Sequence, residues 1–401
     1  MNQLLITIKA VLDSAFFQNL KNNLKEFIKE NVRLAFEDLK ELNTILTEIS
    51  KTSNLTKTQL NELGDAAFET ASKLGRKASD FLADVREMYH AGYKNAEELA
   101  ELSALAQNSG NLKADLANDY IMASDAAYRY SGNIEKLTAL LDAQNQVTNR
   151  NAVTMEELAN ATKISASQLA NVNIGENEMT ALLGTGISAT QESGAIVGRA
   201  VNGIIMSLQQ IQGETGFETE ILDAESLSKV EERCKSLGIE LKTMHNGMVS
   251  LRDPMEILKE LAYVYNTLPD DSTQKAGILS DIGGKYRSNV LSGILSNWDL
   301  YEKMLADYEN AGGSALDETM KSAESWEGSL NRLSNTWTET IGNIANSDAV
   351  ITMINSFNSL LSVLNLVTNA LGPLGSIGLG VGLFSGLKNV GSPETYGRII
   401  V

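Results

Sequence analysis

The residue types that most often carry out catalysis are sparse in this sequence. Its only histidines are His90 and His245, and its single cysteine is Cys234. A thiol beside an imidazole could act as a nucleophile with its base. Cys234 and His245, however, are separated by a predicted helix end and hairpin, so we interpret them as a buried structural cysteine and a turn histidine. Neither histidine has a Cys, His or paired carboxylate at i+3 or i+4, the spacing of a helical zinc site. We therefore expect no catalytic residue and no metal site.

Two glycine-rich stretches could be considered for binding phosphate. Residues 184–189 (GTGISA) partly match the dinucleotide-binding fingerprint, but no strand precedes them and no βαβ unit surrounds them. The run from Gly375 to Gly386 lacks the Lys-Ser/Thr ending of a phosphate-binding loop. We predict that residues 184–189 form a loop between helices, and that the chain has no cofactor.

Composition limits the function classes further. The chain has 401 residues with 51 Asp+Glu against 33 Lys+Arg, a formal charge of −18. Nucleic-acid surfaces need clustered Lys and Arg, which are not found here, so we expect no sequence-specific nucleic-acid binding. One cysteine excludes an intramolecular disulfide framework and favours a reducing compartment. The N-terminal residues have no basic region typical of a secretory signal.

Four prolines and abundant Ala, Leu, Asn, Ser and Glu predict a mainly helical chain. We predict an all-α fold, elongated or bundle-like, with one small β-hairpin near residues 239–252. The hairpin is indicated by Asn246-Gly247 between two short runs of alternating apolar residues. Asp253-Pro254 then predicts an N-cap and first turn of a helix that runs to about Asn266.

The chain is expected to divide into four parts. Residues 1–57 have apolar residues spaced four and three apart from Ile28 to Ile49, which predicts a coiled coil or helical hairpin, with an ordinary core-facing helix as the alternative. Residues 58–222 should form a multi-helix core. Residues 223–346 should contain the hairpin and a helical unit, and residues 347–401 an uncharged, glycine-rich tail.

A long amphipathic helix is predicted from about Ala315 to Asn346. The residues that we call the apolar stripe lie on one face of it and are our candidate packing or oligomer seam: Trp326, Leu330, Leu333 and Trp337. The alternative is that they belong to an ordinary helical core.

Directly after this helix, residues 349–387 contain no charged side chain. Gly372-Pro373 should divide this tract into residues 349–371, long enough to span a bilayer at about 20 residues, and a shorter second segment. The pattern favours a buried or oligomeric packing segment over bilayer insertion. The candidate residues for membrane insertion or tight packing combine apolar positions with glycines four apart: Ile354, Phe357, Leu361, Leu364, Gly378, Gly382 and Gly386.

Several ordered segments resemble the tail tape measure proteins of long-tailed bacteriophages, of the type shared by lactococcal phages and related prophages. The first is the multi-helix stretch that ends at residues 180–211 (TALLGTG…SLQQI). It is followed in the family's order and spacing by three more specific segments, namely residues 236–269 (SLGIELKT…YNTLP), 282–305 (IGGKYRSN…YEKML) and 322–342 (SAESWEGS…TETIG). The resemblance covers roughly residues 60–345. Family members are usually much longer, so this chain would be a truncated product, a fragment or one part of a split gene.

The resemblance implies a helical protein in the lumen of the tail, around which tail-tube subunits polymerise to a set length. It implies tail-tube, tail assembly chaperone and tail-tip or baseplate proteins as partners, self-association, and assembly in the host cytoplasm. It also implies that residues 349–387 enter the host membrane and help DNA across. The alternative class is a secreted α-helical pore-forming or toxin-translocation protein, which would require an export route.

Overall fold

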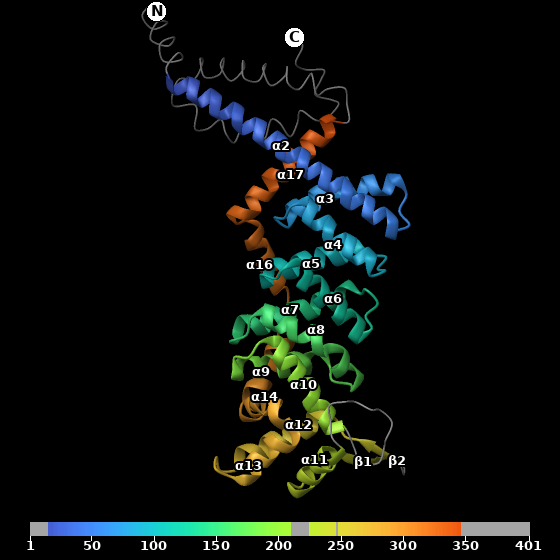
Figure 1. The fold of residues 1–401 in the computed structure, drawn as a ribbon, viewed down its shortest axis with the longest axis vertical. Coiled ribbons are helices and arrows are strands. Elements are labelled where there is room, and N and C mark those ends of the chain that lie inside the picture. The colour runs from blue at the N-terminus through green and yellow to red at the C-terminus, as the bar shows by residue number, and fades with distance from the viewer. Residues whose placement is uncertain (1–14, 210–223, 246–247, 346–401) are drawn as a thin grey trace, which may run out of the picture. The chain divides into compact units, whose positions relative to one another are not determined.

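The computed structural model describes residues 15–209, 224–245 and 248–345 (Figure 1). Its contacts group into two compact units. Residues 83–325 form the larger unit, and residues 1–82 with 326–401 form the other. We call them the central unit and the terminal unit, and describe each by itself.

The terminal unit is built around a long helix, α2 (Ala15–Thr52), which packs against α17 (Trp326–Ala345) and α3 (Lys57–Lys73). Ala35, Leu42 and Ile49, three positions of the predicted heptad pattern, are buried. One face of α2 is therefore buried, with α3 and α17 as its packing partners, and the coiled-coil or helical-hairpin assignment stays a prediction. Thr56 starts α3 as the N-cap of a capping box with Gln59, which satisfies otherwise unpaired amides of the first turn.

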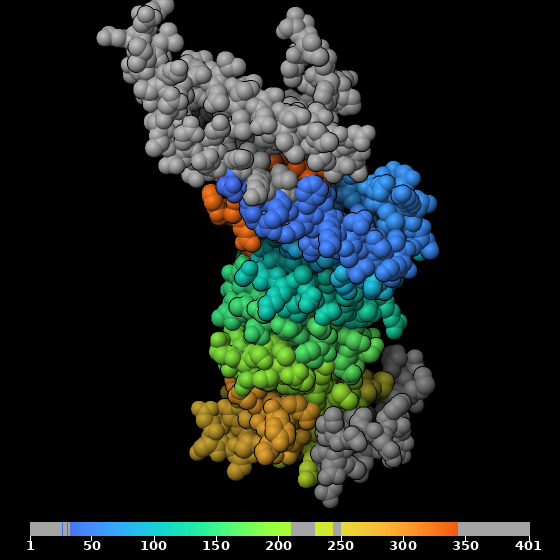
Figure 2. Space-filling model, turned by 45° about the horizontal axis from the view of Figure 1, so that its top comes forward, coloured from blue at the N-terminus to red at the C-terminus, as the bar shows by residue number. Residues whose placement is uncertain are grey.

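The central unit begins within α4 (Ala78–His90) and continues through a run of helices joined by short connections (Figure 1). These are α5 (Ala96–Gly110), α6 (Ala114–Tyr128), α7 (Ile134–Arg150), α8 (Met155–Asn171), α9 (Glu176–Thr190) and α10 (Gly194–Gln209). Asn133 and Thr154 cap α7 and α8 through their side-chain oxygens. On the face shown in Figure 2, this part of the chain forms successive bands that run from teal to yellow-green in sequence order.

The only sheet in the described residues is a two-stranded hairpin. After α11 (Ala224–Ser236), β1 (Lys242–His245) pairs antiparallel with β2 (Met248–Leu251), with Lys242 opposite Leu251 and His245 opposite Met248. Asp253 then accepts a hydrogen bond from the Met255 amide at 2.8 Å and starts α12 (Pro254–Thr267). The predicted all-α fold with a hairpin in this region and the Asp253 cap are thus confirmed.

The rest of the central unit is helical. It comprises α13 (Thr273–Ile278), the π-helical turn η1 (Leu279–Gly283), α14 (Gly284–Ser296), α15 (Trp298–Glu309) and α16 (Ser314–Ala323). The single helix predicted from Ala315 to Asn346 is wrong, because α16 ends at Ala323 and α17 begins at Trp326. The physical reason is that α16 packs on α5 and α7, whereas α17 packs on α2 and α3, so different partners determine each helix axis.

The core of the central unit is continuous from α7 to α15. It contains aliphatic and aromatic side chains that are almost completely withdrawn from solvent, among them Leu158, Leu183, Ile205 and Leu291. This burial supplies the main driving force for packing the helices, at roughly 25 cal/mol per Å² of apolar surface.

Candidate functional site

The structure places the thiol and imidazole residues that the sequence singled out in different settings, and describes one of them, His245, by its backbone alone. Cys234 is completely buried, and burial raises the pKa of its thiol to about 12, although Arg233 acts in the opposite direction. A buried protonated thiol is a poor nucleophile. His90 is exposed at the end of α4, and the side chain of His245 is outside the described part. Among the described residues, no three His, Cys, Asp or Glu side chains are grouped as a metal site would require.

The glycine motif at residues 184–189 lies inside helix α9, so its prediction as a loop is wrong. Gly184 and Gly186 are buried there because neighbouring side chains fill the space where a Cβ would be. An added Cβ would lie 2.7 Å from the Met304 sulfur at Gly184, and 2.7 Å from a Val197 methyl carbon at Gly186. The motif therefore serves close helix packing and has no open backbone for a phosphate.

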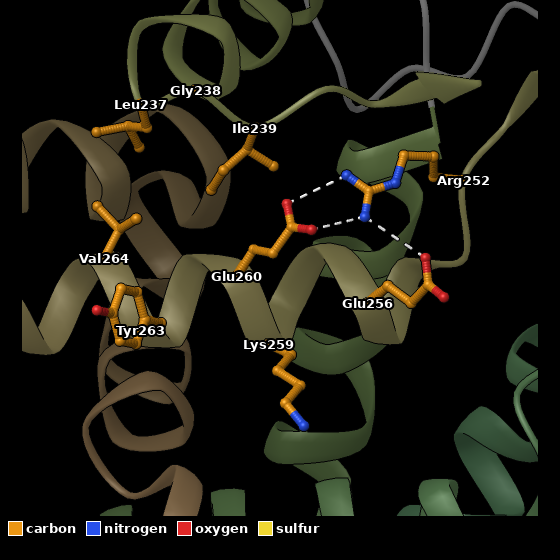
Figure 3. Close-up of a pocket in the computed structure, with 9 residues that line it drawn as sticks. All are labelled: Leu237, Gly238, Ile239, Arg252, Glu256, Lys259, Glu260, Tyr263 and Val264. Atoms are coloured by element: carbon orange, nitrogen blue, oxygen red, sulfur yellow. Dashed lines mark hydrogen bonds and ion pairs between the residues drawn. The ribbon is translucent and has the colours of Figure 1, made fainter. Parts of the chain in front are cut away.

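A surface groove of about 620 Å³ lies between α12 and the connection from α11 to β1, lined by the nine residues labelled in Figure 3. Its polar centre is Arg252, whose guanidinium donates to Glu260 at 2.7 Å and to Glu256 at 3.4 Å. The hydrogen bond from Arg252 lowers the pKa of Glu260. Lys259 points away from these ion pairs (Figure 3). Because Arg252 is already paired with both carboxylates, its positive charge is largely neutralised and has little attraction for an anion.

Buried polar side chains instead form bridges between helices of the central unit. Asp84 accepts hydrogen bonds from the amides of Gln107 at 2.8 Å and Asn118 at 2.9 Å, and the Ser103 hydroxyl donates to Asn118 at 2.5 Å. All four side chains are buried. Sequence reasoning missed this network. The available signal was a series of polar residues on otherwise apolar helix faces.

A second bridge fixes the start of α16. Asp142 on α7 accepts hydrogen bonds from the backbone amides of Gly313 at 3.0 Å and Ala315 at 2.9 Å, and its carbonyl accepts from the Ser314 hydroxyl. A carboxylate at a helix N-terminus accepts hydrogen bonds from the free amides of the first turn and is attracted by the positive end of the helix dipole. Here that carboxylate comes from another helix, so it also joins α16 to α7.

A third bridge is centred on Asp307 of α15. It accepts hydrogen bonds from Asn151 at 3.0 Å, Lys303 at 3.0 Å and Arg150 at 3.2 Å. Burial by itself would raise the pKa of Asp307, but these three donors outweigh burial and hold the pKa below its ordinary value. The arrangement attaches the end of α7 to α15.

In the terminal unit, α17 is attached through its polar face. The Asn335 side chain accepts from the Ala78 amide at 3.0 Å and donates to the Arg76 carbonyl at 2.7 Å and the Ser72 hydroxyl at 3.1 Å. On the same side, Ser334 and Thr338 both donate to Asp38 of α2.

The apolar stripe of α17 consequently lies away from this polar attachment. Trp326 is 81% exposed and Leu330 is 47% exposed, while Leu333 and Trp337 are half-buried. Their role as a packing or oligomer seam stays a prediction. The other candidate residues, from Ile354 to Gly386, lie outside the described part of the chain. Within the part that is described, no helix has the length and apolar character needed to cross a bilayer.

In the described residues, these polar clusters hold helices of the same unit to one another. The phage-related minor tail protein family matches residues 65–284, from within α3 to the first residue of α14, which is more than half of the chain. The chain belongs to this family. It is therefore a phage tail protein and a component of the virion. No solved structure matches the chain.

Proposed function

We propose that this tail protein is the tape measure, the scaffold around which tail-tube subunits polymerise and which sets the length of the tail. The observation that carries the proposal is family membership over residues 65–284 in a chain whose described part is helical almost throughout. A helix converts residue number into length, at about 1.5 Å per residue. The order of the segments from residues 180 to 342 adds support through its resemblance to tape measure proteins.

In this role the protein occupies the lumen of the tail. Its partners are the tail-tube protein, the tail assembly chaperones and the tail-tip or baseplate proteins, together with further copies of itself. The apolar stripe is the proposed packing seam, because Trp326 and Leu330 present apolar surface to solvent. Large aromatic side chains of this kind are frequent anchors in protein interfaces.

The decisive test changes the length of the chain in the intact phage. Deleting or duplicating the 38 residues of α2 should shorten or lengthen the tail by at most about 57 Å, the length of that helix. Tail lengths would be measured on electron micrographs of purified particles. The control is Gly312→Ala, which leaves the residue number unchanged. Tails of normal length from both length variants would overturn the proposal.

We further propose that residues 349–387, which lie outside the described residues, help DNA cross the host membrane. The support is a tract without charges that includes a segment of bilayer-spanning length. A peptide covering residues 348–388 should gain helicity with lipid vesicles and release a trapped dye. The same peptide with Phe357→Lys and Leu361→Lys should do neither. No leakage from the unmodified peptide would remove this part of the proposal.

A further inference from the structure

The bridge at Asp307 contains the three kinds of group that amide-bond chemistry requires. The Lys303 amine donates a hydrogen bond to the Asn151 side-chain oxygen at 2.6 Å and another to Asp307 Oδ2 at 3.0 Å. The same Asp307 oxygen accepts a hydrogen bond from the Asn151 side-chain nitrogen at 3.0 Å. One carboxylate oxygen thus contacts both an amine, which is a nucleophile when neutral, and the nitrogen that an attack on the Asn151 side chain would expel.

We propose that Lys303 and Asn151 form an intramolecular isopeptide bond, with Asp307 as the acid–base group. This inference is independent of the tape measure role, because it concerns side chains within the central unit. Asn151 directly follows α7, and Lys303 lies on α15. The bond therefore joins the end of α7 to α15 covalently, between residues 152 positions apart.

The amine lies close to the carbon that it has to attack. The C=O bond of an amide is about 1.2 Å long, so an amine 2.6 Å from the Asn151 oxygen is at most about 3.8 Å from the carbonyl carbon. Reacting atoms in a near-attack arrangement are about 3–3.5 Å apart. A small shift of the flexible lysine side chain is enough to reach that separation.

The Asn151 amide is held in one orientation. Its nitrogen donates to Asp307 and also to the Val147 carbonyl at 2.8 Å, while its oxygen accepts from Lys303. A reversed amide would place its oxygen against two acceptors and its nitrogen against an ammonium group. The leaving nitrogen therefore faces the carboxylate that has to protonate it. Arg150 donates to the other oxygen of that carboxylate at 3.2 Å and so fixes its direction.

The reaction exchanges one amide for another and needs no oxidant or further reactant. Asp307 accepts a proton from the Lys303 ammonium group, and the neutral Nζ attacks the Asn151 side-chain carbonyl carbon. The new bond joins Nζ to this carbon, and the bond from the carbon to Nδ2 breaks. Nζ loses two protons in all, which Asp307 passes in turn to the leaving nitrogen. An ammonium ion is released, the net charge is conserved, and Asp307 is ionised again at the end.

The surroundings suit this exchange. Asp307 is only 7% exposed, which limits competition from water, whereas the Lys303 side chain is 52% exposed, so ammonium can leave to solvent. Holding the two reactants side by side removes the entropic cost of bringing them together, and a positioned acid–base group contributes about 100-fold to 10,000-fold in rate. Loss of ammonium to the solvent makes the exchange effectively irreversible.

Mass spectrometry of the full-length protein tests the proposal. The wild-type chain should be lighter than its sequence mass by one ammonia molecule, and a protease digest should contain a branched peptide that joins Asn151 to Lys303. Succinimide formation at Asn246-Gly247 also releases ammonia, so the branched peptide is the deciding observation. Wild-type protein that contains no branched peptide after prolonged incubation at neutral pH would refute the proposal.

Three variants identify the groups that react. Lys303→Arg keeps the positive charge but removes the nucleophile, so no branched peptide should form. Lys259→Arg, at an exposed ion pair on α12, is the matched control and should react as the wild type does. Asp307→Asn keeps both reactants and, once circular dichroism has shown that it is folded, should form the bond about 100-fold more slowly or less.

The outcomes of these variants separate the two parts of the proposal. A folded Asp307→Asn protein that reacts at the wild-type rate would show that Asp307 is not the acid–base group. A branched peptide at Asn151 in Lys303→Arg would show that another lysine is the nucleophile. If Asp307→Asn does not fold, the wild type and Lys303→Arg decide by themselves whether the bond forms.

Discussion

Three aspartates join helices of the central unit through hydrogen bonds. Asp84, Asp142 and Asp307 each accept hydrogen bonds from at least two groups on other segments, and Asp84 and Asp307 are buried. A buried carboxylate is costly unless donors surround it. The donors reach each aspartate only when the helices are correctly placed. The hydrogen bonds therefore stabilise that placement.

Asp307 should make the protein sensitive to acid. Its pKa in the folded chain is below the ordinary 3.8, so its stabilising contribution is present above that pH and is lost as the pH falls through the folded pKa. Asp307→Asn should lower the free energy of unfolding at pH 7 by about 1–3 kcal/mol and should weaken its decline below about pH 4. Urea unfolding at pH 7, 4 and 3 would measure both effects. Glu309→Gln, on the exposed side of α15, is the control, and an Asp307→Asn variant as stable as wild type at pH 7 would disprove the assignment.

Among the helices, the α8–α10 pair depends most clearly on small residues. Gly194 and Gly198 are four apart on α10 and face the backbone of α8. A Cβ at Gly194 would lie 1.8 Å from the Glu157 carbonyl oxygen, and one at Gly198 would lie 2.9 Å from the Ala161 carbonyl oxygen. Close backbone approach of this kind leaves no room for a methyl group.

Gly194→Ala should therefore force α10 away from α8. We expect the free energy of unfolding to fall by about 1–3 kcal/mol, the usual range for overpacking. Chemical denaturation followed by circular dichroism would measure the change. Gly312→Ala is the matched control, because no atom lies within 4 Å of the Cβ that it would introduce. Equal stability of the two variants would show that the helices can separate at little cost.

For the whole molecule, the excess of acidic residues is the dominant electrostatic feature. The formal charge of −18 opposes the compact state of the chain through self-repulsion. Most of the ion pairs in the described residues are at the surface, such as Arg33 with Glu37, where each contributes little. Repulsion summed over the chain should outweigh them.

The melting temperature should accordingly rise with ionic strength. Between about 10 mM and 150 mM NaCl the Debye length shortens from roughly 30 Å to 8 Å, which screens long-range repulsion more than contacts between paired charges. A gain of about 1 kcal/mol would raise the melting temperature by about 2 °C, as scanning calorimetry would measure. A fall in melting temperature over this range would instead mean that the ion pairs dominate.

Features encoded by neighbouring residues could be predicted from the sequence. The hairpin follows from alternating residues around Asn246-Gly247, and the start of α12 follows from Asp253-Pro254, because turn and cap preferences depend on residues only a few positions apart. The all-α class and the phage tail family were accessible for the same reason, since helix periodicity and ordered local segments carry both. The bridges made by Asp84, Asp142 and Asp307 and the groove beside α12 could not be placed in this way, because the groups that meet there are far apart in the sequence.

Packing between distant segments decided the rest. Gly184 and Gly186 look like loop residues until Met304 and Val197 are placed against them inside α9. The division of one predicted helix into α16 and α17 depends on separate partners for each half. The stripe around Trp326 and Leu330 predicts a buried face, yet α17 packs through Asn335, whose bond to Ala78 joins residues 257 positions apart. Local backbone preference determines that a segment is helical, but the face that it buries depends on which distant surface can satisfy its polar groups.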